Sequence, residues 1–423
     1  MARCLSEAVE SGVQETEVVA QFPDPQIDQS TAPPIHESPP PTRILIVAGE
    51  ASGDLHGARL VEALRWLRPR LSLEGMGGEK MRAAGVTLLA DAGETAVVGL
   101  TELWEKRRAL RDALRVLREH LRAVRPALLI CIDFPDFNLL LARTAQRLGI
   151  PVCYFISPQV WAWRRGRIRT IRRLVRKMLV LFPFEEALYR TAGVDATCVG
   201  HPLVDVLADV PPRQACRAAL DVEGEAPVLG LLPGSRQAEI RRHLPILLQA
   251  AARVRVDRPD LRLLLGLAAS LDRRMVEAEI QAAQLPVQLV QGRTHEVMRA
   301  ADLLLAVSGT VTLEAAILGT PMVITYRAGA FTWYVARLLV HVRFIGLPNL
   351  VAGEAIVPEL IQSAATSERL AIAALEILAS PARQARMRSA LEGVRARLGE
   401  AGAAERAARE VLALLPVSPG CGA

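Results

Sequence analysis

The sequence is poor in aromatic residues, which make up 4% of its 423 positions, and it lacks paired cysteines. Leu, Ala and Val supply the apolar mass, which favours helices packed on a sheet over an aromatic-rich β-sandwich. The six cysteines include no Cys-x-x-Cys pair, so we expect neither a zinc site nor a disulfide framework, and a reducing compartment fits best. His56, His201 and His295 have no partners at ligand spacing, so we expect no metal and no cofactor.

An uninterrupted apolar segment of membrane-spanning length is also missing. Such a helix needs about 20 apolar residues, and the best candidate, residues 301–326, is broken by two acids and a proline. Glu7 and Glu10 interrupt the region where a signal peptide would need an apolar stretch, so we expect no export. A mean hydropathy of +0.23 still leaves room for attachment to a membrane surface.

The alternation of short apolar runs with helical periodicity predicts the fold class. Apolar runs at 44–48, 127–132, 152–156 and 178–182 are typical of buried parallel strands, and a second set lies at 228–232, 261–265, 287–290, 303–307 and 322–325. We therefore predict an α/β protein with two doubly wound, Rossmann-like domains and a cleft between them. The predicted parts are a disordered Pro-rich leader at 1–42, domains at 43–205 and 206–345, C-terminal helices at 346–415 that pack back on the N-terminal half or on a partner subunit, and a flexible tail at 416–423.

Two strand-to-helix turns in the second half are suited to an anion. Gly234, Ser235 and Arg236 would present backbone N–H groups and a guanidinium to a diphosphate, although an N-capping serine with a solvated arginine explains them equally well. Ser308, Gly309 and Thr310 form a similar turn, and Glu314 lies one turn into the following helix, where it could accept the hydroxyls of a ribose. Two such turns in one half favour a nucleotide over helix caps alone.

The loops of the first half are acidic. Glu50, Ser52 and Asp54 follow the first strand, and these acids would repel a pyrophosphate, so a sugar or another polyol is the better guess. Asp133, beside Phe134, could have its pKa raised by desolvation toward general-base duty. Capping or turn chemistry is the alternative interpretation of these aspartates.

Positive charge is concentrated in two stretches, although the net charge is only +6. Residues 164–177 include eight basic residues and no acid, and residues 106–125 are also strongly basic. Such stretches fit anionic lipid headgroups. RNA backbone and an ordinary solvated helix face are the alternatives, and a phosphorylated lipid substrate is mildly preferred over nucleic acid.

Several motifs together are similar to one family. They are Gly49-Glu50-Ala51-Ser52-Gly53-Asp54, Asp133-Phe134-Pro135-Asp136-Phe137-Asn138, Ser157-Pro158-Gln159-Val160-Trp161-Ala162-Trp163-Arg164, Gly200-His201-Pro202, Leu232-Pro233-Gly234-Ser235-Arg236, Ser308-Gly309-Thr310 with Leu313-Glu314, and Leu347-Pro348-Asn349-Leu350. In order and wording they resemble lipid-A-disaccharide synthase over about residues 44–360. The resemblance implies a metal-independent, inverting glycosyltransferase of the two-domain GT-B fold. It would move 2,3-diacylglucosamine from UDP onto 2,3-diacylglucosamine 1-phosphate, forming a β-1,6 disaccharide.

The resemblance also implies roles for individual residues. Asp133 and Glu50 would be the catalytic carboxylates, with the choice of base left open. The nucleotide-sugar side would hold Gly234, Ser235, Arg236, Ser308, Gly309, Thr310, Glu314 and Asn349. The acceptor and lipid side would hold Ser52, Asp54, Asp136, Asn138, Trp161, Trp163 and Arg164. The implied partners are the two lipid substrates and an anionic membrane at the inner face of the inner membrane, without nucleic acid and with a homodimer left open.

Two other classes of protein stay open at this point. A hexosamine epimerase or the peptidoglycan glucosaminyl transferase would share the fold but should lack the motif at residues 157–164. A non-enzymatic membrane-surface or RNA-binding protein would explain the basic stretches. It would not explain why two turns suited to an anion, at 234–236 and 308–310, face the acidic residues Glu50 and Asp133.

Overall fold

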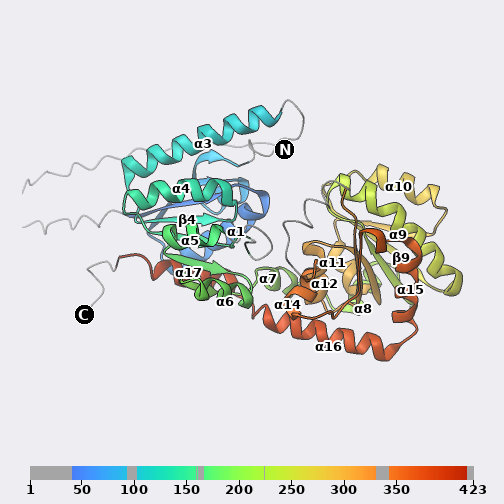
Figure 1. The fold of residues 1–423 in the computed structure, drawn as a ribbon. Helices are drawn as coiled ribbons and strands as arrows, with labels where there is room; N and C mark the ends of the chain where they lie inside the picture. The colour runs from blue at the N-terminus through green and yellow to red at the C-terminus, as the bar shows by residue number, and fades with distance from the viewer. Residues whose placement is uncertain are drawn as a thin grey trace, which may run out of the picture. The chain divides into compact units, whose positions relative to one another are not determined.

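The computed structural model describes residues 41–92, 102–158, 160, 166–222, 224–329 and 343–416, and these form two parallel β-sheets covered by helices (Figure 1). The predicted α/β class is confirmed. Of the predicted leader only Pro41 and Thr42 are described, and Thr42 already begins the first strand. The predicted tail lies outside the described residues after position 416.

The first sheet has seven strands in the order β3-β2-β1-β4-β5-β6-β7. They are β1 (Thr42–Ala48), β2 (Leu71–Gly77), β3 (Thr87–Asp91), β4 (Leu128–Ile132), β5 (Val152–Phe155), β6 (Lys177–Val180) and β7 (Ala196–Cys198). The apolar run of β1 is buried on both faces, with Ile44 and Ile46 in one core and Leu45 and Val47 in the other. This two-sided burial explains why the run is continuous rather than alternating.

Helices cover both faces of this sheet. They are α1 (Ala51–Leu67), α2 (Glu79–Ala83), α3 (Glu102–Val124), α4 (Pro135–Arg147), α5 (Arg167–Leu174), α6 (Pro183–Thr191) and α7 (Leu203–Ala208). α1 packs into the core that contains Ile44, whereas α3, α4 and α5 pack side by side on the opposite core (Figure 1). In α3, Leu117 and Leu121 are fully buried, and their four-residue spacing places both on the face toward the sheet.

The second sheet has six strands in the order β10-β9-β8-β11-β12-β13. They are β8 (Val228–Leu232), β9 (Arg262–Leu267), β10 (Val287–Gln291), β11 (Leu303–Val307), β12 (Met322–Tyr326) and β13 (Glu359–Ile361). The remaining helices are α8 (Arg213–Ala219), α9 (Gln237–Asp257), α10 (Arg273–Ala282), α11 (Thr294–Ala300), α12 (Thr310–Ile317), α14 (Leu347–Ala352), η3 (Gln362–Ala364), α15 (Ser367–Leu378), α16 (Pro381–Arg397) and α17 (Ala403–Leu412).

Each sheet has one switch point, where neighbouring strands send their connections in opposite directions. In the first sheet it lies between β1 and β4, and in the second between β8 and β11. Ligands of such sheets bind in the crevice outside the carboxyl ends of these two strands. Glu50 and Asp133 follow β1 and β4, and Arg236 and Ser308 follow β8 and β11, so the fold places the candidate residues at both switch points.

The C-terminal region, predicted as helices at 346–415 that pack back on the N-terminal half or on a partner subunit, contains one short strand besides its helices. β13 joins the second sheet beside β12, α15 packs on α9, and α16 packs on α12 and α14. α17 packs against α1 of the first half. The short apolar run of β13 gives no sequence signal that separates it from a loop, because three residues carry little periodicity.

Among the described residues, no helix combines the length and the apolar character needed to cross a membrane.

Candidate functional site

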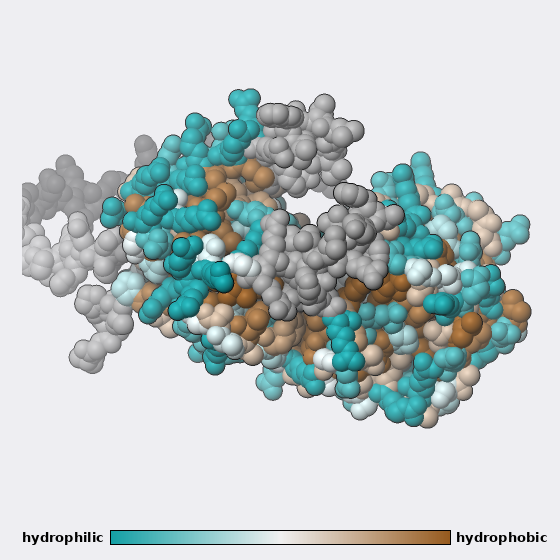
Figure 2. Space-filling view, viewed as in Figure 1, coloured by the Kyte–Doolittle hydropathy of each residue, from teal (hydrophilic) through white to brown (hydrophobic). Residues whose placement is uncertain are grey.

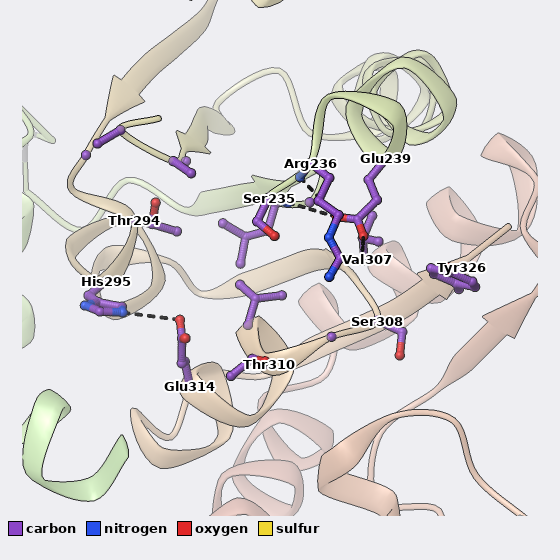
Figure 3. A pocket seen from close by; sticks show the side chains of 18 of the residues that line it. Ser235, Arg236, Glu239, Thr294, His295, Val307, Ser308, Thr310, Glu314 and Tyr326 are labelled. Carbon is purple, nitrogen blue, oxygen red and sulfur yellow. Dashed lines mark hydrogen bonds and ion pairs between the residues drawn. The ribbon is translucent and has the colours of Figure 1, made fainter. Parts of the chain in front are cut away.

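A pocket of about 560 Å³ lies at the carboxyl edge of the second sheet (Figure 3). Its volume is within the range of small-molecule and cofactor sites. Seven of the predicted nucleotide-side residues line it together, namely Gly234, Ser235, Arg236, Ser308, Gly309, Thr310 and Glu314. The ends of β9 and β10 add further lining at Gly266 and Gly292. A Cβ at Gly266 would lie 2.9 Å from the Leu232 side chain, so the close packing there requires glycine.

The turn after β8 serves partly as a helix cap. Gly234 has a φ of +117°, and a Cβ there would lie 2.7 Å from Glu239 Oε2. Glu239 Oε2 accepts hydrogen bonds from the backbone N–H groups of Ser235 at 3.0 Å and Arg236 at 3.3 Å. A carboxylate therefore occupies the N–H groups that were expected to bind a diphosphate. The Arg236 side chain itself is 83% exposed, with Nη1 3.7 Å from Glu239 Oε1, so the guanidinium is the accessible cationic group of this turn.

The turn after β11 leads into the second half of the pocket. Within the described parts of the chain, nothing lies within 4 Å of the position that a Cβ of Gly309 would take, so these residues leave the space in front of this turn open. Glu314 Oε2 lies 3.2 Å from His295 Nε2, and Figure 3 shows this pair at one end of the pocket with Arg236 and Glu239 at the other. A carboxylate oriented by an imidazole is suited to accept hydrogen bonds from vicinal hydroxyls.

Asn349 links α14 to β13. It is buried in α14, where its Nδ2 donates to Val357 O and Glu359 Oε1. Its Oδ1 accepts from the N–H groups of Ile356 and Val357. Both ends of the amide thus hold the chain between α14 and β13, and Asn349 is not among the residues that line this pocket. A direct contact of Asn349 with the nucleotide stays a prediction.

The acidic pair lies at the switch point of the first sheet. Glu50 is the exposed N-cap residue of α1, and Asp133 is partly buried directly after β4. Burial, and after it the charge of Glu50, raises the pKa of Asp133 to about 6. This is the desolvation effect that the sequence suggested. It brings the pKa of the carboxyl group closer to neutral pH, where a general base works best.

A close approach between two loops supports this pair. A Cβ on Gly49 would lie 2.1 Å from Phe134 Cδ1, so the Phe134 ring occupies the space that any larger residue at 49 would need. The two loops that carry Glu50 and Asp133 are therefore in direct contact. The Phe134 ring also stacks with Phe137, at 5.3 Å between ring centroids.

Asp54 caps a neighbouring helix. Its side chain is buried, and its carboxylate accepts hydrogen bonds from the N–H groups of Gly78 at 2.7 Å, Lys80 at 3.1 Å and Met81 at 3.0 Å. Both oxygens thus cap α2, and a contact with substrate hydroxyls stays a prediction. Ser52, in contrast, is exposed in the first turn of α1.

The remaining residues predicted on the acceptor side differ in their surroundings. Asp136 is exposed and forms an ion pair with Arg167. Asn138 is fully buried, and its Nδ2 donates to the carbonyls of Ile132 and Asp133. Trp161, Trp163 and Arg164 lie outside the described residues.

Sequence reasoning missed several contributors to these sites. Tyr154 donates from Oη to Asp133 O, His295 orients Glu314, Glu239 caps the first turn, and Tyr326 lines the pocket. From the sequence, His295 is considered only as a metal ligand, although its position four residues after the end of β10 is a signal. In the described part of the chain, no group of three or more His, Cys, Asp and Glu residues could hold a metal ion.

Two switch-point sites on two doubly wound sheets define the class as a GT-B protein, the fold shared by glycosyltransferases and sugar-nucleotide epimerases. A UDP-GlcNAc 2-epimerase from Neisseria meningitidis, solved bound to UDP-GlcNAc, superposes with a TM-score of 0.60 at 12% identity, covering 88% of this chain and 100% of the epimerase. At that identity the likeness establishes the fold alone.

The family follows from closer relatives. The family model for lipid-A-disaccharide synthetase matches residues 44–413, and the chain belongs to this family. The lipid-A-disaccharide synthase of Syntrophus aciditrophicus is 46% identical over 376 residues, which cover 89% of this chain and 98% of the relative. That of Myxococcus xanthus is also 46% identical, with the same coverage of both chains. The resemblance identified from the motifs is thereby confirmed.

Proposed function

We propose that this chain is a lipid-A-disaccharide synthase, a hexosyltransferase that condenses UDP-2,3-diacylglucosamine with 2,3-diacylglucosamine 1-phosphate. The products are the β-1,6-linked disaccharide 1-phosphate and UDP. The family match and relatives at 46% identity support this activity over an epimerase, the peptidoglycan enzyme or a non-enzymatic surface protein. The observation in the structure that carries the proposal is the acidic pair of Asp133 and Glu50 at the first switch point, with an Asp133 pKa of about 6.

The chemistry assigned to this pair is one displacement. The 6-hydroxyl oxygen of the acceptor attacks C1 of the donor sugar from the face opposite the diphosphate, and the bond from C1 to the diphosphate oxygen breaks. Asp133 takes the hydroxyl proton, because a carboxylate with a raised pKa is a stronger base that still ionises near neutrality. Glu50 favours the protonated product state of Asp133 by its negative charge.

The nucleotide side is assigned to the pocket of the second sheet. Arg236 would balance the charge on the departing diphosphate, since an exposed guanidinium can form two parallel hydrogen bonds to phosphate oxygens. Glu314, oriented by His295, would accept hydrogen bonds from the ribose hydroxyls. Gly234, Ser235, Ser308, Gly309 and Thr310 would form the walls next to the phosphates and the sugar.

The test is product formation from defined substrates. The protein is incubated with UDP-2,3-diacylglucosamine and the monosaccharide 1-phosphate, and mass spectrometry follows disaccharide and UDP together. We expect both products in equal amounts without added metal. UDP-GlcNAc serves as the comparison donor, and its epimerisation in place of transfer would contradict the proposal.

We further propose that the enzyme works at the surface of an anionic membrane, on the inner face of the inner membrane. Exposed arginines on three adjacent helices and the segment after α5 support this, namely Arg108, Arg111, Arg115 and Arg122 on α3, Arg143 and Arg147 on α4, and Arg169, Arg172, Arg173 and Arg176 on and after α5. We call this set the arginine face, and Figure 2 shows hydrophilic residues over these helices. Among the side chains of these helices that the structure describes, exposed acids are fewer, at Asp112, Glu119 and Asp136. Diacylated substrates give such an enzyme a reason to stay at a lipid surface.

We also propose how the chain is divided into domains and how it assembles. The domain limits at 43–205 and 206–345, with the first domain on the acceptor side and the second on the UDP-sugar side, stay a proposal. A homodimer likewise remains a prediction. Size-exclusion chromatography with light scattering on the full chain would decide the oligomeric state.

A further inference from the structure

The main chain that carries Asp133 has an unusual conformation. Asp133 has a φ of +44° and Phe134 a φ of +48°, so two consecutive residues with side chains occupy the left-handed region. Such residues favour the right-handed or extended regions, and they stay left-handed only where the surroundings hold them. The turn changes the direction of the chain between the end of β4 and the start of α4.

Three hydrogen bonds fix this turn at Asp133 itself. Tyr154 Oη donates to Asp133 O at 2.5 Å, and Asn138 Nδ2 donates to the same oxygen at 2.7 Å. The Asp133 N–H donates to Phe155 O at 3.1 Å, which anchors the turn to the neighbouring strand β5. The Asp133 carbonyl therefore accepts two side-chain donors.

The two donors are themselves rigid. Tyr154 and Asn138 are both fully buried, so neither side chain can turn away into solvent. Asn138 Nδ2 also donates to Ile132 O at 3.2 Å, which ties the last residue of β4 to the same amide. Burial raises the pKa of Tyr154 well above its ordinary value, so the hydroxyl keeps its proton and remains a donor at every working pH.

We infer that Tyr154 and Asn138 are positioning residues, which grip the main chain of Asp133 and thereby hold its carboxylate beside Glu50. This inference rests on the proposed role of Asp133 as the base. The hydroxyl of Tyr154 and the amide of Asn138 act through the carbonyl of Asp133 rather than on the substrate. The loss of one donor lets the turn relax, and the carboxyl group then moves toward water and away from its place in the reaction.

Tyr154→Phe is the direct test, because it removes one hydroxyl and keeps the buried ring. We expect kcat to fall at least tenfold while the KM for UDP-2,3-diacylglucosamine and the Kd for UDP stay within twofold. We also expect the acid limb of the kcat profile to move from about pH 6 toward the ordinary carboxyl range, because the relaxed Asp133 regains water. A residue with only a structural role would lower stability without moving that limb.

Tyr189→Phe is the matched control. Tyr189 is also fully buried in the same core as Tyr154, but its hydroxyl donates to Pro158 O at 3.5 Å and not to Asp133. Its kcat and acid limb should remain those of the wild type, and thermal unfolding of both variants separates stability from activity. If Tyr154→Phe does not fold, Asn138→Ala replaces it. We expect the same fall in kcat and the same shift of the acid limb.

The outcomes separate this inference from the proposed function. Wild-type kcat and an unmoved acid limb in Tyr154→Phe would overturn the inference, as would equal losses in Tyr189→Phe. Failure of the wild-type protein to form disaccharide from the defined substrates would instead overturn the proposed function, and the positioning role with it.

Discussion

At the scale of single residues, the role proposed for Asp133 as a base and the stability of the fold make opposite demands on its carboxyl group. Partial burial holds its pKa near 6, which suits a base. The same burial makes the ionised carboxylate costly to the folded state, because an unfolded chain would expose it to water. The conflict has a sign that can be worked out. Between the unfolded pKa near 3.8 and the folded pKa near 6, the folded protein binds the proton more tightly, so stability falls as pH rises through this window.

Asp133→Asn should therefore be more stable than the wild type at high pH. We expect the free energy of unfolding of the wild type to lose about 2 kcal/mol relative to the variant between pH 4 and pH 7. The amide carries no charge, so the variant lacks this loss. Urea unfolding at pH 4 and pH 7 measures it, and equal stability of the two proteins at both values would show that burial does not oppose ionisation of Asp133.

Arg236 supplies the corresponding test on the nucleotide side. Arg236→Ala should weaken UDP binding by about 1.5–3 kcal/mol, roughly 10- to 150-fold, because a charge-assisted contact to phosphate is lost. The fold should not change, since the side chain is 83% exposed. Titration calorimetry with UDP gives the affinity.

Arg241→Ala is the control for this experiment. Arg241 is also exposed on α9 but is not among the residues that line the nucleotide pocket of the second sheet. Its removal should therefore leave UDP affinity within twofold. An unchanged affinity in Arg236→Ala would mean that the turn is only the helix cap that Glu239 makes it in the structure.

At the scale of secondary-structure elements, α17 connects distant parts of the sequence. It packs against α1, and Ala403, Ala407, Ala408 and Val411 are its buried residues. Asp205, at the first turn of α7, accepts a hydrogen bond from the N–H of Gly402 at 2.5 Å and thereby fixes the start of α17. The helix that begins with the first acidic loop is thus supported by the last helix of the described chain.

A charge in this contact should destabilise the protein. Val411→Asp places an unpaired carboxylate at a fully buried position, and we expect the free energy of unfolding to fall by about 3 kcal/mol or more. Ala401→Asp, an exposed position just before α17, should change it by less than about 0.5 kcal/mol. Equal effects of the two changes in thermal unfolding would show that α17 does not stabilise the fold through α1.

The elements also show what the sequence could and could not predict. Buried parallel strands such as β1 and β4 can be predicted because their apolar runs are continuous. Site residues can be predicted after them, because ligands of such sheets bind at the carboxyl ends of the strands. The backbone contacts of Asp54 and Asn138 could not be predicted, because a short polar side chain next to a loop looks the same in sequence whether it binds backbone or substrate. The left-handed turn at Asp133 and the contact of α17 with α1 depend on residues far away in sequence, and no local pattern encodes them.

At the scale of the whole molecule, the arginine face predicts how the enzyme meets its lipids. Reversing the charge of Arg169, Arg173 and Arg176 to Glu should lower binding to anionic vesicles at least tenfold, since each cation near such a surface contributes about 1 kcal/mol. Activity on bilayer-embedded substrate should fall with it, and activity on detergent-dispersed substrate much less.

Three exposed arginines of the second half provide the control, with the same change of net charge. Reversal of Arg274, Arg386 and Arg395 should leave vesicle binding within twofold of the wild type. Wild-type binding should also weaken with added salt, because charges at a surface are screened. Binding that is equal for neutral and anionic vesicles and insensitive to salt would show that the arginine face is only a solvated surface.

The central claim is that Asp133 is the base of a glycosyl transfer whose nucleotide binds on the other sheet. The most direct measurement is the turnover of Asp133→Asn with both lipid substrates, together with its affinity for UDP. The account predicts a loss of roughly two to four decades in kcat with UDP affinity unchanged, because the amide keeps the shape of the side chain but cannot take a proton. Turnover near the wild-type rate in Asp133→Asn, with Glu50→Gln inactive, would contradict the account and move the base to Glu50.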